Sequence, residues 1–359
     1  MGVKITGESP IYPMPKLSPD PPKTEEPSTP APLLSAEERW KAIDLVRASL
    51  EKEHKLENPL VRMGDKVGKP IPSISTGLIT WDDIFDCGGV PRGRIIEFIG
   101  PESSGKTTAA LQVVAEAQKL GEMAAYIDAE HALDVNYAKK LGVDVDNLLV
   151  SQPDCGEDAL NIVEALVKSR AVSVIIVDSV AALVPRAELE GEMGESHMGL
   201  QARLMSQACR KLRGICNTTG TTLIFINQLR DKIGVTYGSP ETTTGGRALR
   251  FYASVRLDIR RLSDIKEGDE VIGQKIRIRA IKNKCGLPKR EAELDLYHGK
   301  GFDTLADVLQ IACREGIVQQ AGGWFALKNK KYRKADLDEA QIRQAIKEHN
   351  EAISKASKI

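Results

Sequence analysis

The sequence is poor in aromatic side chains and has no net charge. Phe, Trp and Tyr make up 4% of the 359 residues, so an aromatic surface for stacking bases is not an obvious feature. Lys and Arg total 50, as do Asp and Glu. This balance argues against a polycationic protein that coats nucleic acid, and it leaves room only for a local basic channel.

Long hydrophobic runs and cysteine motifs are also missing. No stretch approaches the ~20 apolar residues that span a bilayer. The N-terminus lacks the apolar core of a signal peptide, so we expect a cytoplasmic protein with no membrane partner. The 6 cysteines form no CxxC pair, which favours reduced thiols over a disulfide framework or a cysteine metal site.

Proline is concentrated at the start of the chain, where nine of the 18 prolines precede residue 33. A segment this rich in Pro, Ser, Glu and Lys cannot repay its ordering entropy, so residues 1–34 are predicted to be a disordered extension. Two PxxP spacings, at 10–13 and 19–22, leave partner binding as the alternative.

A helix is predicted to follow this extension. Ser35 and Glu38 have the spacing of a capping box. The residues that follow at helical spacing are Trp40, Ile43, Val46 or Arg47, and Leu50. Residues 35–66 are therefore expected to form an oligomerisation helix and a linker. A single helix is marginal alone, so its apolar side must pack either on the chain's own core or on a neighbouring subunit.

From residue 67 to 300, short apolar runs alternate with helical patterns. The runs lie at 94–99, 124–127, 174–177 and 223–226, and the helical patterns at 107–120, 159–169 and 200–216. The runs lack period-two alternation, as is typical of strands buried on both faces of a parallel sheet. The sequence predicts an α/β fold, a phosphate-loop ATPase core with a doubly wound, mostly parallel sheet. Residues 301–359, with a helix over 304–314, predict a small α+β domain.

A complete phosphate-loop motif follows the first apolar run. Residues 100–107 read GPESSGKT, which matches GxxxxGK[ST]. The loop's N–H groups and the N-terminus of the next helix cradle phosphates. Lys106 is expected to reach the β- and γ-phosphates, and Thr107 to bind Mg²⁺. A glycine-rich turn without a ligand is the alternative, which the flanking strand and helix disfavour.

Polar side chains end three further strands. Asp178 lies at the strand edge where α/β sheets bind ligands, so we predict a second metal ligand beside Thr107; capping of the next helix is the alternative. Glu130 and Asp128 both lie at the end of another strand, and either could orient an attacking water. The pattern alone does not separate them. Gln228 ends a third strand with an amide able to sense the γ-phosphate.

Taken together, these residues resemble the bacterial RecA recombinase family. The shared stretches are GPESSGKTT (100–108), YIDAEHALD (126–134), VDSVAALVP (177–185), GESHMGLQAR (194–203), LIFINQ (223–228), PETTTGG (240–246) and FYASVRLDIRR (251–261). The resemblance implies an ATP- and Mg²⁺-dependent recombinase that forms helical filaments on single-stranded DNA. Such proteins pair that strand with homologous duplex DNA and hydrolyse ATP in recombination and repair. A ring helicase on the same fold and a non-catalytic DNA-filament scaffold are the alternatives.

The resemblance also implies roles for individual residues. Glu130 matches the family's catalytic glutamate, and Gln228 the glutamine that couples the γ-phosphate to DNA binding. Lys282 and Lys284 match two lysines that reach the ATP of the adjacent subunit. The nucleotide-binding positions are Gly100, Pro101, Glu102, Ser103, Ser104, Gly105, Lys106, Thr107, Thr108, Asp134, Tyr137 and Asp178, of which Thr107 and Asp178 bind the metal.

Two loops are expected to bind DNA. The first, residues 190–199, is acidic, so only the resemblance and the residues beside it support this role. The second, residues 230–247, combines small and hydroxyl side chains that suit sequence-neutral contact with phosphates. The predicted DNA-binding residues are Met198, Arg203, Ser206, Arg210, Ile233, Val235, Gly245, Gly246 and Arg247.

The sequence departs from the family's pattern in three places. Residues 1–34 have no counterpart. His298, with Tyr297 beside it, stands where the family has a tyrosine near the base. The segment from Trp324 onward has nine Lys or Arg against five Asp or Glu, a net charge of +4, where the family has an acidic tail. These departures favour a divergent or phage-borne member.

Overall fold

The computed structural model describes residues 34–55, 60, 62, 70–192, 199–231, 241–328 and 330–356. Residues 1–33 of the predicted extension lie outside these ranges. The chain divides into two compact units, Met1–Lys69 and Pro70–Ile359, and we treat each by itself. Within the described ranges, no helix is both long and apolar enough to cross a bilayer.

The first unit contains helix α1 (Ala36–His54), and its predicted capping box is present. The Glu38 N–H donates to Ser35 Oγ (3.3 Å), and the Ser35 N–H donates to Glu38 Oε2 (2.8 Å). No residue of α1 is buried. The exposed apolar side chains are Trp40, Ile43, Leu45 and Val46. The helix therefore exposes apolar side chains, and the Arg62 guanidinium lies over the Trp40 ring (3.9 Å).

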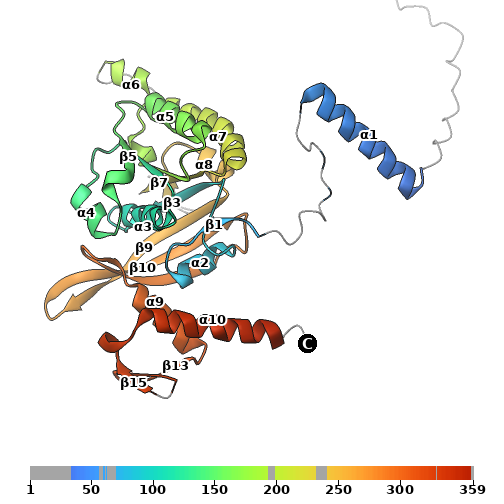
Figure 1. Cartoon of the computed structure of the whole chain (residues 1–359). Helices are drawn as coiled ribbons and strands as arrows, with labels where there is room; N and C mark the ends of the chain where they lie inside the picture. Colours follow the sequence, from blue (N-terminus) through green and yellow to red (C-terminus); the bar gives the residue numbers. More distant parts are fainter. Residues whose placement is uncertain are drawn as a thin grey trace, which may run out of the picture. The chain divides into compact units, whose positions relative to one another are not determined.

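The second unit is built on a ten-stranded sheet in the order β12-β11-β10-β9-β3-β7-β6-β4-β5, with β8 paired to β7 (Figure 1). The parallel strands are β3 (Ile95–Gly100), β4 (Ala124–Asp128), β5 (Leu148–Ser151), β6 (Val174–Asp178), β7 (Thr222–Asp231) and β9 (Val255–Glu267). The antiparallel strands are β8 (Glu241–Thr243), β10 (Glu270–Asn283), β11 (Glu291–Tyr297) and β12 (Gly301–Phe302). A separate pair joins β1 (Ser73–Ile74) to β2 (Val90–Pro91). The mostly parallel sheet is confirmed, whereas its antiparallel extension through the long β9–β10 hairpin was not predicted.

Helices cover both faces of the sheet because successive residues of a strand point to opposite sides. In β3, Ile96 and Phe98 join one core cluster, and Ile95 joins the other. The first cluster includes residues of α2 (Ile79–Phe85), α3 (Lys106–Lys119) and α4 (Val135–Lys140); the second includes residues of α5 (Gly156–Ser169), α7 (Leu200–Thr219) and α8 (Ala248–Tyr252). A short α6 (Arg186–Glu190) lies on the surface. The doubly wound arrangement agrees with the prediction.

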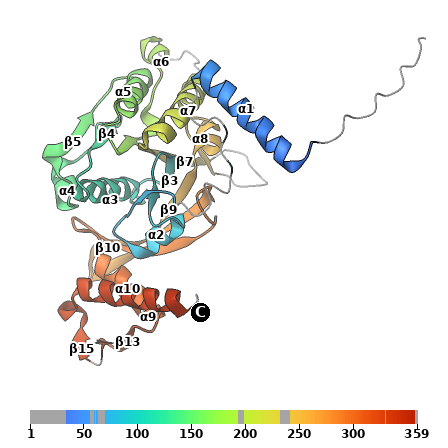
Figure 2. The ribbon, with the colours of Figure 1, turned by 45° about the vertical axis from the view of Figure 1, so that its right-hand side comes forward.

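The C-terminal segment forms a small layer of its own beside the sheet (Figures 1 and 2). Its elements are α9 (Thr304–Arg314), β13 (Val318–Ala321), β14 (Trp324–Leu327), β15 (Lys330–Arg333) and α10 (Glu339–Ala356). The segment starts two residues later than expected, because Gly301 and Phe302 are the last strand of the central sheet.

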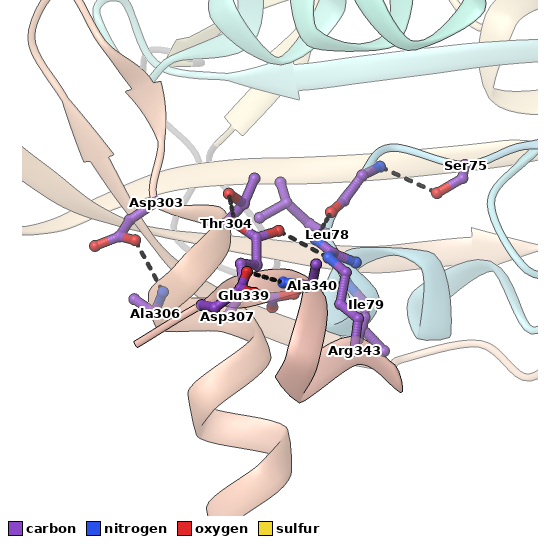
Figure 3. Close-up of polar contacts among 12 residues, drawn as sticks. Ser75, Leu78, Ile79, Asp303, Thr304, Ala306, Asp307, Glu339, Ala340 and Arg343 are labelled. Atoms are coloured by element: carbon purple, nitrogen blue, oxygen red, sulfur yellow. Dashed lines mark hydrogen bonds and ion pairs between the residues drawn. The ribbon is translucent and has the colours of Figure 1, made fainter. Parts of the chain in front are cut away.

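Polar contacts connect this layer to the nucleotide-binding core (Figure 3). Asp307 on α9 accepts hydrogen bonds from the N–H groups of Ile79 (2.6 Å) and Thr80 (3.3 Å), and so caps α2 from a distance. Arg343 on α10 donates to the Gly77 carbonyl (2.7 Å). The position of α2 therefore depends on residues more than two hundred positions away.

Candidate active site

The phosphate loop joins the end of β3 to the start of α3, as the motif requires. A Cβ at Gly100 would lie 2.2 Å from the Ile259 carbonyl oxygen, so only glycine fits there. Gly105 has φ +92°, which a residue with a side chain rarely adopts. The two glycines thus allow the tight backbone turn that a phosphate cradle needs.

Two side chains of the loop indicate an anionic ligand. Lys106 is 7% exposed, and its ammonium donates to the Pro101 carbonyl (2.6 Å). Burial lowers the pKa of Lys106, and nearby Asp178 opposes that shift. Among the described residues, the buried Ser104 hydroxyl has no hydrogen-bond partner. A buried cation and an unpaired buried hydroxyl are costly without a ligand, and both fit a phosphate group.

Behind the loop lies a small set of oxygen ligands. The Thr107 hydroxyl donates to Asp178 Oδ2 (2.8 Å), and the Tyr126 hydroxyl donates to the same oxygen (2.6 Å). Burial raises the pKa of Asp178, and these hydrogen bonds oppose the shift. No cluster of three His, Cys, Asp or Glu occurs in the described part of the chain. One hydroxyl and one carboxylate fit Mg²⁺, which keeps waters and phosphate oxygens as its other ligands. The contact of Tyr126 with Asp178 was not predicted.

The two candidate water-orienting carboxylates differ in their surroundings. Asp128 is 2% exposed and accepts hydrogen bonds from Ala132 N (3.1 Å), Leu133 N (3.1 Å) and Gln152 Nε2 (2.9 Å). Its oxygens are therefore occupied in holding the turn after β4.

Glu130, in contrast, is exposed at the end of the sheet. Its Oε1 accepts a hydrogen bond from Gln228 Nε2 (2.9 Å), and the Ser179 hydroxyl also contacts it. The structure thus brings together two predicted residues that are 98 positions apart. Ser179 follows Asp178 directly, and its contact with Glu130 was missed because nothing in the sequence marks it.

The other side of the loop offers a place for a nucleoside. Thr108 and Tyr137 share a hydrogen bond between their hydroxyls (2.8 Å). Asp134 caps α4 by accepting from Asn136 N (2.8 Å) and Tyr137 N (3.1 Å), and so fixes the start of the helix that carries Tyr137. A cavity of about 210 Å³ lies here. It is lined by Ser103, Ser104, Gly105, Lys106, Thr107, Thr108, Tyr137, Gln274, Leu296, Tyr297 and His298. Gln274 and Leu296 were not predicted because they come from the antiparallel extension.

The structure does not bring Lys282 and Lys284 to the phosphate loop of the same chain. Strand β10 places Lys282 opposite Arg256, and β9 runs parallel to β3 with Arg256 opposite Glu97. The two lysines therefore lie beside the start of β3, whereas the phosphate loop follows its end. Glu97 lies three residues before the end of β3, so the two places are separated by roughly 10 Å along the strand.

Of the predicted DNA-binding residues, those described gather around the start of α7. Arg203 and Arg210 are exposed and two helical turns apart, and Ser206 lies between them half-buried. A Cβ at Gly246 would lie 2.7 Å from Ala202 Cβ, and the buried Gly245 lies against Met205. The end of the second loop therefore packs on the helix that follows the first. Arg247 is exposed, and Met198, Ile233 and Val235 lie outside the described residues.

Part of the second predicted loop is a β-ladder. Strand β7 continues to Asp231 and pairs with β8, with Arg230 opposite Thr242. Thr244 is committed to Asn227: its hydroxyl donates to Asn227 Oδ1 (2.7 Å), and its carbonyl accepts from Asn227 Nδ2 (3.1 Å). Residues 230–231 and 241–243 of the predicted loop are therefore strand in this structure. Three β-branched residues after a proline give too short a pattern to show a strand.

A buried charged pair continues this contact into the core. Asn227 Nδ2 also donates to Glu97 Oε1 (2.9 Å), and Arg256 Nε donates to Glu97 Oε2 (2.5 Å). Glu97 is fully buried and Arg256 is 5% exposed. A glutamate inside the apolar run IIEFIG was the available signal for this pair.

Comparison with known proteins agrees with this geometry. The family model described as the RecA N-terminal domain matches residues 41–303. Protein RecA of Acidothermus cellulolyticus is 56% identical over 293 residues, which cover 82% of this chain and 85% of that protein. Protein RecA of Mycobacterium ulcerans is 56% identical over 82% of this chain and 84% of its own. Protein RecA of Geobacter metallireducens is 54% identical over 319 residues, 89% of this chain and 93% of its own.

These matches confirm the family, the recombinase function and the enzyme class that the sequence predicted. The chain belongs to the RecA family and is a DNA-dependent ATPase of recombination and DNA repair.

Proposed function

We propose that this chain binds ATP and Mg²⁺ at the phosphate loop and completes the site with lysines from a neighbouring subunit in a helical filament. The observation that carries this proposal is the position of Lys282 and Lys284 at the start of β3, away from the chain's own loop. Cations held away from their own loop are available to a second copy whose loop faces them. A charge supplied in this way stabilises the transition state of phosphoryl transfer as an arginine finger does.

Within one subunit, each residue has a distinct task. Lys106 turns from the Pro101 carbonyl toward the bound phosphates, and Thr107 with Asp178 supplies oxygen ligands for Mg²⁺. When bound, that ion neutralises charge on the phosphate oxygens. Glu130 orients the attacking water and accepts its proton, since its carboxylate is exposed and held by a single amide and a hydroxyl. Gln228 connects this carboxylate to β7, which leads to the second DNA loop.

Single-stranded DNA is proposed to bind where the two loops meet α7. The guanidinium groups of Arg203, Arg210 and Arg247 form no ion pair with another described residue, and all three are exposed. Contacts to phosphate of this kind position a strand without reading its bases, as pairing with any homologous duplex requires. The proposed place of action is the cytoplasm, and the apolar side of α1 is proposed to pack on a neighbouring subunit.

Electron microscopy of the full chain on single-stranded DNA, with a slowly hydrolysed ATP analogue, tests the assembly. We expect an open helical filament. A closed ring would instead support a helicase, and DNA-bound monomers would contradict the shared site.

Mixing two inactive variants tests where the lysines act. Lys106→Ala lacks a working loop, and Lys282→Ala lacks a working donor. Neither should hydrolyse ATP alone, but a mixture contains interfaces in which a normal loop faces normal lysines. Recovery of DNA-stimulated ATPase at intermediate ratios supports the proposal, and no recovery at any ratio overturns it.

A further inference from the structure

Asn283 lies between the two proposed donor lysines, and both polar atoms of its side chain are hydrogen-bonded within the fold. Its Nδ2 donates to the carbonyls of Phe85 (3.1 Å) and Ile84 (3.2 Å), with a weaker contact to Leu287 (3.5 Å). Its Oδ1 accepts from the Cys285 N–H (2.8 Å). One amide therefore joins the end of β10 both to the turn that follows it and to helix α2.

The acceptors on α2 are carbonyls that would otherwise lack a partner. Ile84 and Phe85 are the last residues of α2, and the last carbonyls of a helix have no partner inside it. A second contact holds the same place: a Cβ at Gly286 would lie 2.2 Å from Asp86 Cβ, so the turn touches the helix end directly. The Leu287 N–H donates to Asp86 Oδ2 (3.3 Å). The backbone after β10 is thus fixed to α2 at two points.

The ammonium groups of Lys282 and Lys284 make fewer hydrogen bonds than the Asn283 amide does. Alternation along a strand places Lys282 and Lys284 on one face and Asn283 on the other. Among the described residues, Lys282 Nζ donates to the carbonyls of Arg250 (2.7 Å) and Phe251 (3.1 Å). Neither ammonium forms an ion pair with any residue in the described ranges. Lys282 is half-buried and Lys284 is exposed, and the position of both depends on the backbone that the amide between them fixes.

We propose that Asn283 is a positioning residue, which fixes the backbone from which Lys282 and Lys284 reach the phosphates bound by the neighbouring subunit. This inference rests on the proposed shared site. An amide is required because it both donates to α2 and accepts from the turn; an aspartate of the same shape would only accept. Small displacements of charged groups have large effects on transfer reactions, so loss of this anchor should lower turnover without affecting the nucleotide cradle.

The first measurement is DNA-stimulated ATPase of the full chain carrying Asn283→Ala or the isosteric Asn283→Asp. We expect kcat to fall roughly 10- to 100-fold in both, with KM for ATP changed less than about twofold. Asn350→Ala is the control, because Asn350 is exposed on α10 and has no side-chain hydrogen bond to another described residue. Wild-type kcat in both Asn283 variants would overturn the inference, as would equal losses in kcat and in ATP affinity.

Mixing with Lys106→Ala separates positioning from general damage to the fold. An Asn283→Ala subunit keeps its own phosphate loop, so it should recover activity when a Lys106→Ala neighbour supplies well-placed lysines. Recovery with Lys282→Ala but not with Asn283→Ala would show that Asn283 supports the whole fold, and the inference would be wrong. Failure of both mixtures would reject the shared site itself. Circular dichroism of each variant checks that the outcome does not reflect unfolded protein.

Discussion

The carboxylates at the end of β4 show how two acidic residues two positions apart acquire different surroundings. Asp128 is buried, and three donors occupy its oxygens, whereas Glu130 is exposed and is contacted by Gln228 and Ser179. A group that must accept a proton from water needs a free lone pair facing solvent. The surroundings of Glu130 meet this need, and those of Asp128 do not.

We expect Glu130→Ala to lower ATP turnover by about 10²- to 10⁴-fold, because water activation alone is lost. Nucleotide binding and filament assembly should remain. Asp128→Asn should instead lower stability by about 1–3 kcal/mol, since a buried acceptor in a hydrogen-bonded turn is replaced. Turnover, equilibrium nucleotide binding and thermal unfolding of both variants check this assignment. A selective loss of turnover in Asp128→Asn, with Glu130→Ala active, would reverse it.

We expect Lys282 to give the activity a pH dependence. Burial, reinforced by Lys284, Arg256 and Arg213 and opposed by Glu97, lowers the pKa of Lys282 to about 8. The ammonium is therefore charged below pH 8 and is progressively lost above it. At sub-saturating ATP, we expect ATPase activity to decline as pH rises above about 8, because an uncharged Lys282 must take up a proton before it faces the phosphates. Lys282→Arg, whose guanidinium stays charged, should lack this decline. Identical alkaline limbs in the two proteins would exclude Lys282 as its source.

The same group acts on stability with the opposite sign. Between pH 8 and the ordinary lysine value of 10.5, the unfolded chain keeps a proton that the folded chain has lost. Folding stability from this group therefore rises with pH across that window. A fall in activity at pH 9 thus cannot be attributed to unfolding caused by Lys282.

At the scale of elements, α2 depends on a cap from outside its own sequence. Its N-cap residue, Leu78, has no side-chain hydrogen bond to the helix, and Asp307 on α9 supplies the acceptors instead. We expect Asp307→Ala to lower the free energy of unfolding by about 1–2 kcal/mol, in the range of a lost helix cap. Chemical unfolding followed by circular dichroism measures the change. Asp336→Ala is the matched control, because Asp336 is exposed in the same C-terminal layer and its side chain has no hydrogen bond to another described residue. Equal stability of the two variants would contradict the role of Asp307.

Elements whose signals lie within their own sequence were predicted well. Strands and contacts that depend on residues far away in the chain were not. Helix α9 has the predicted bounds, 304–314, because its cap and apolar spacing are local. The phosphate loop and the strand that ends at Asp178 are local in the same sense. Glu97 and Arg256 are 159 positions apart, and only the pairing of β3 with β9 brings them together. Short strands such as β8 gain their stability from the strand beside them, so their own residues gave no signal.

For the whole molecule, the basic C-terminal layer predicts an effect on duplex DNA. Lys330 and Lys331 on β15 are exposed and form no ion pair with a described residue, whereas Lys334 is paired with Asp303 (3.0 Å). We expect the variant with Lys330→Glu and Lys331→Glu to bind duplex DNA more weakly. Its salt dependence should be shallower by roughly 0.9 in log–log slope for each DNA phosphate that the variant no longer neutralises.

The control variant carries Lys119→Glu and Lys168→Glu, on α3 and α5. Both lysines are exposed, and their ion pairs with Glu116 and Glu164 are surface pairs that contribute little to stability. The control variant has the same net charge as the test variant. If the two variants and the wild-type chain give the same salt slope, the C-terminal layer does not bind duplex DNA.

Lys282 lies away from the phosphate loop along β3 and is proposed to act on the next copy. This arrangement determines how many complete active sites an assembly contains. In such an assembly, each contact joins two different surfaces of neighbouring copies. The assembly grows as an open helix unless the rotation between copies closes it into a ring. An open row of n copies then contains n − 1 complete sites, and one terminal copy binds nucleotide without a donor. The ATPase rate per subunit therefore rises with the length of the open assembly. Short assemblies hydrolyse ATP slowly per subunit, and each break in a long one inactivates one site.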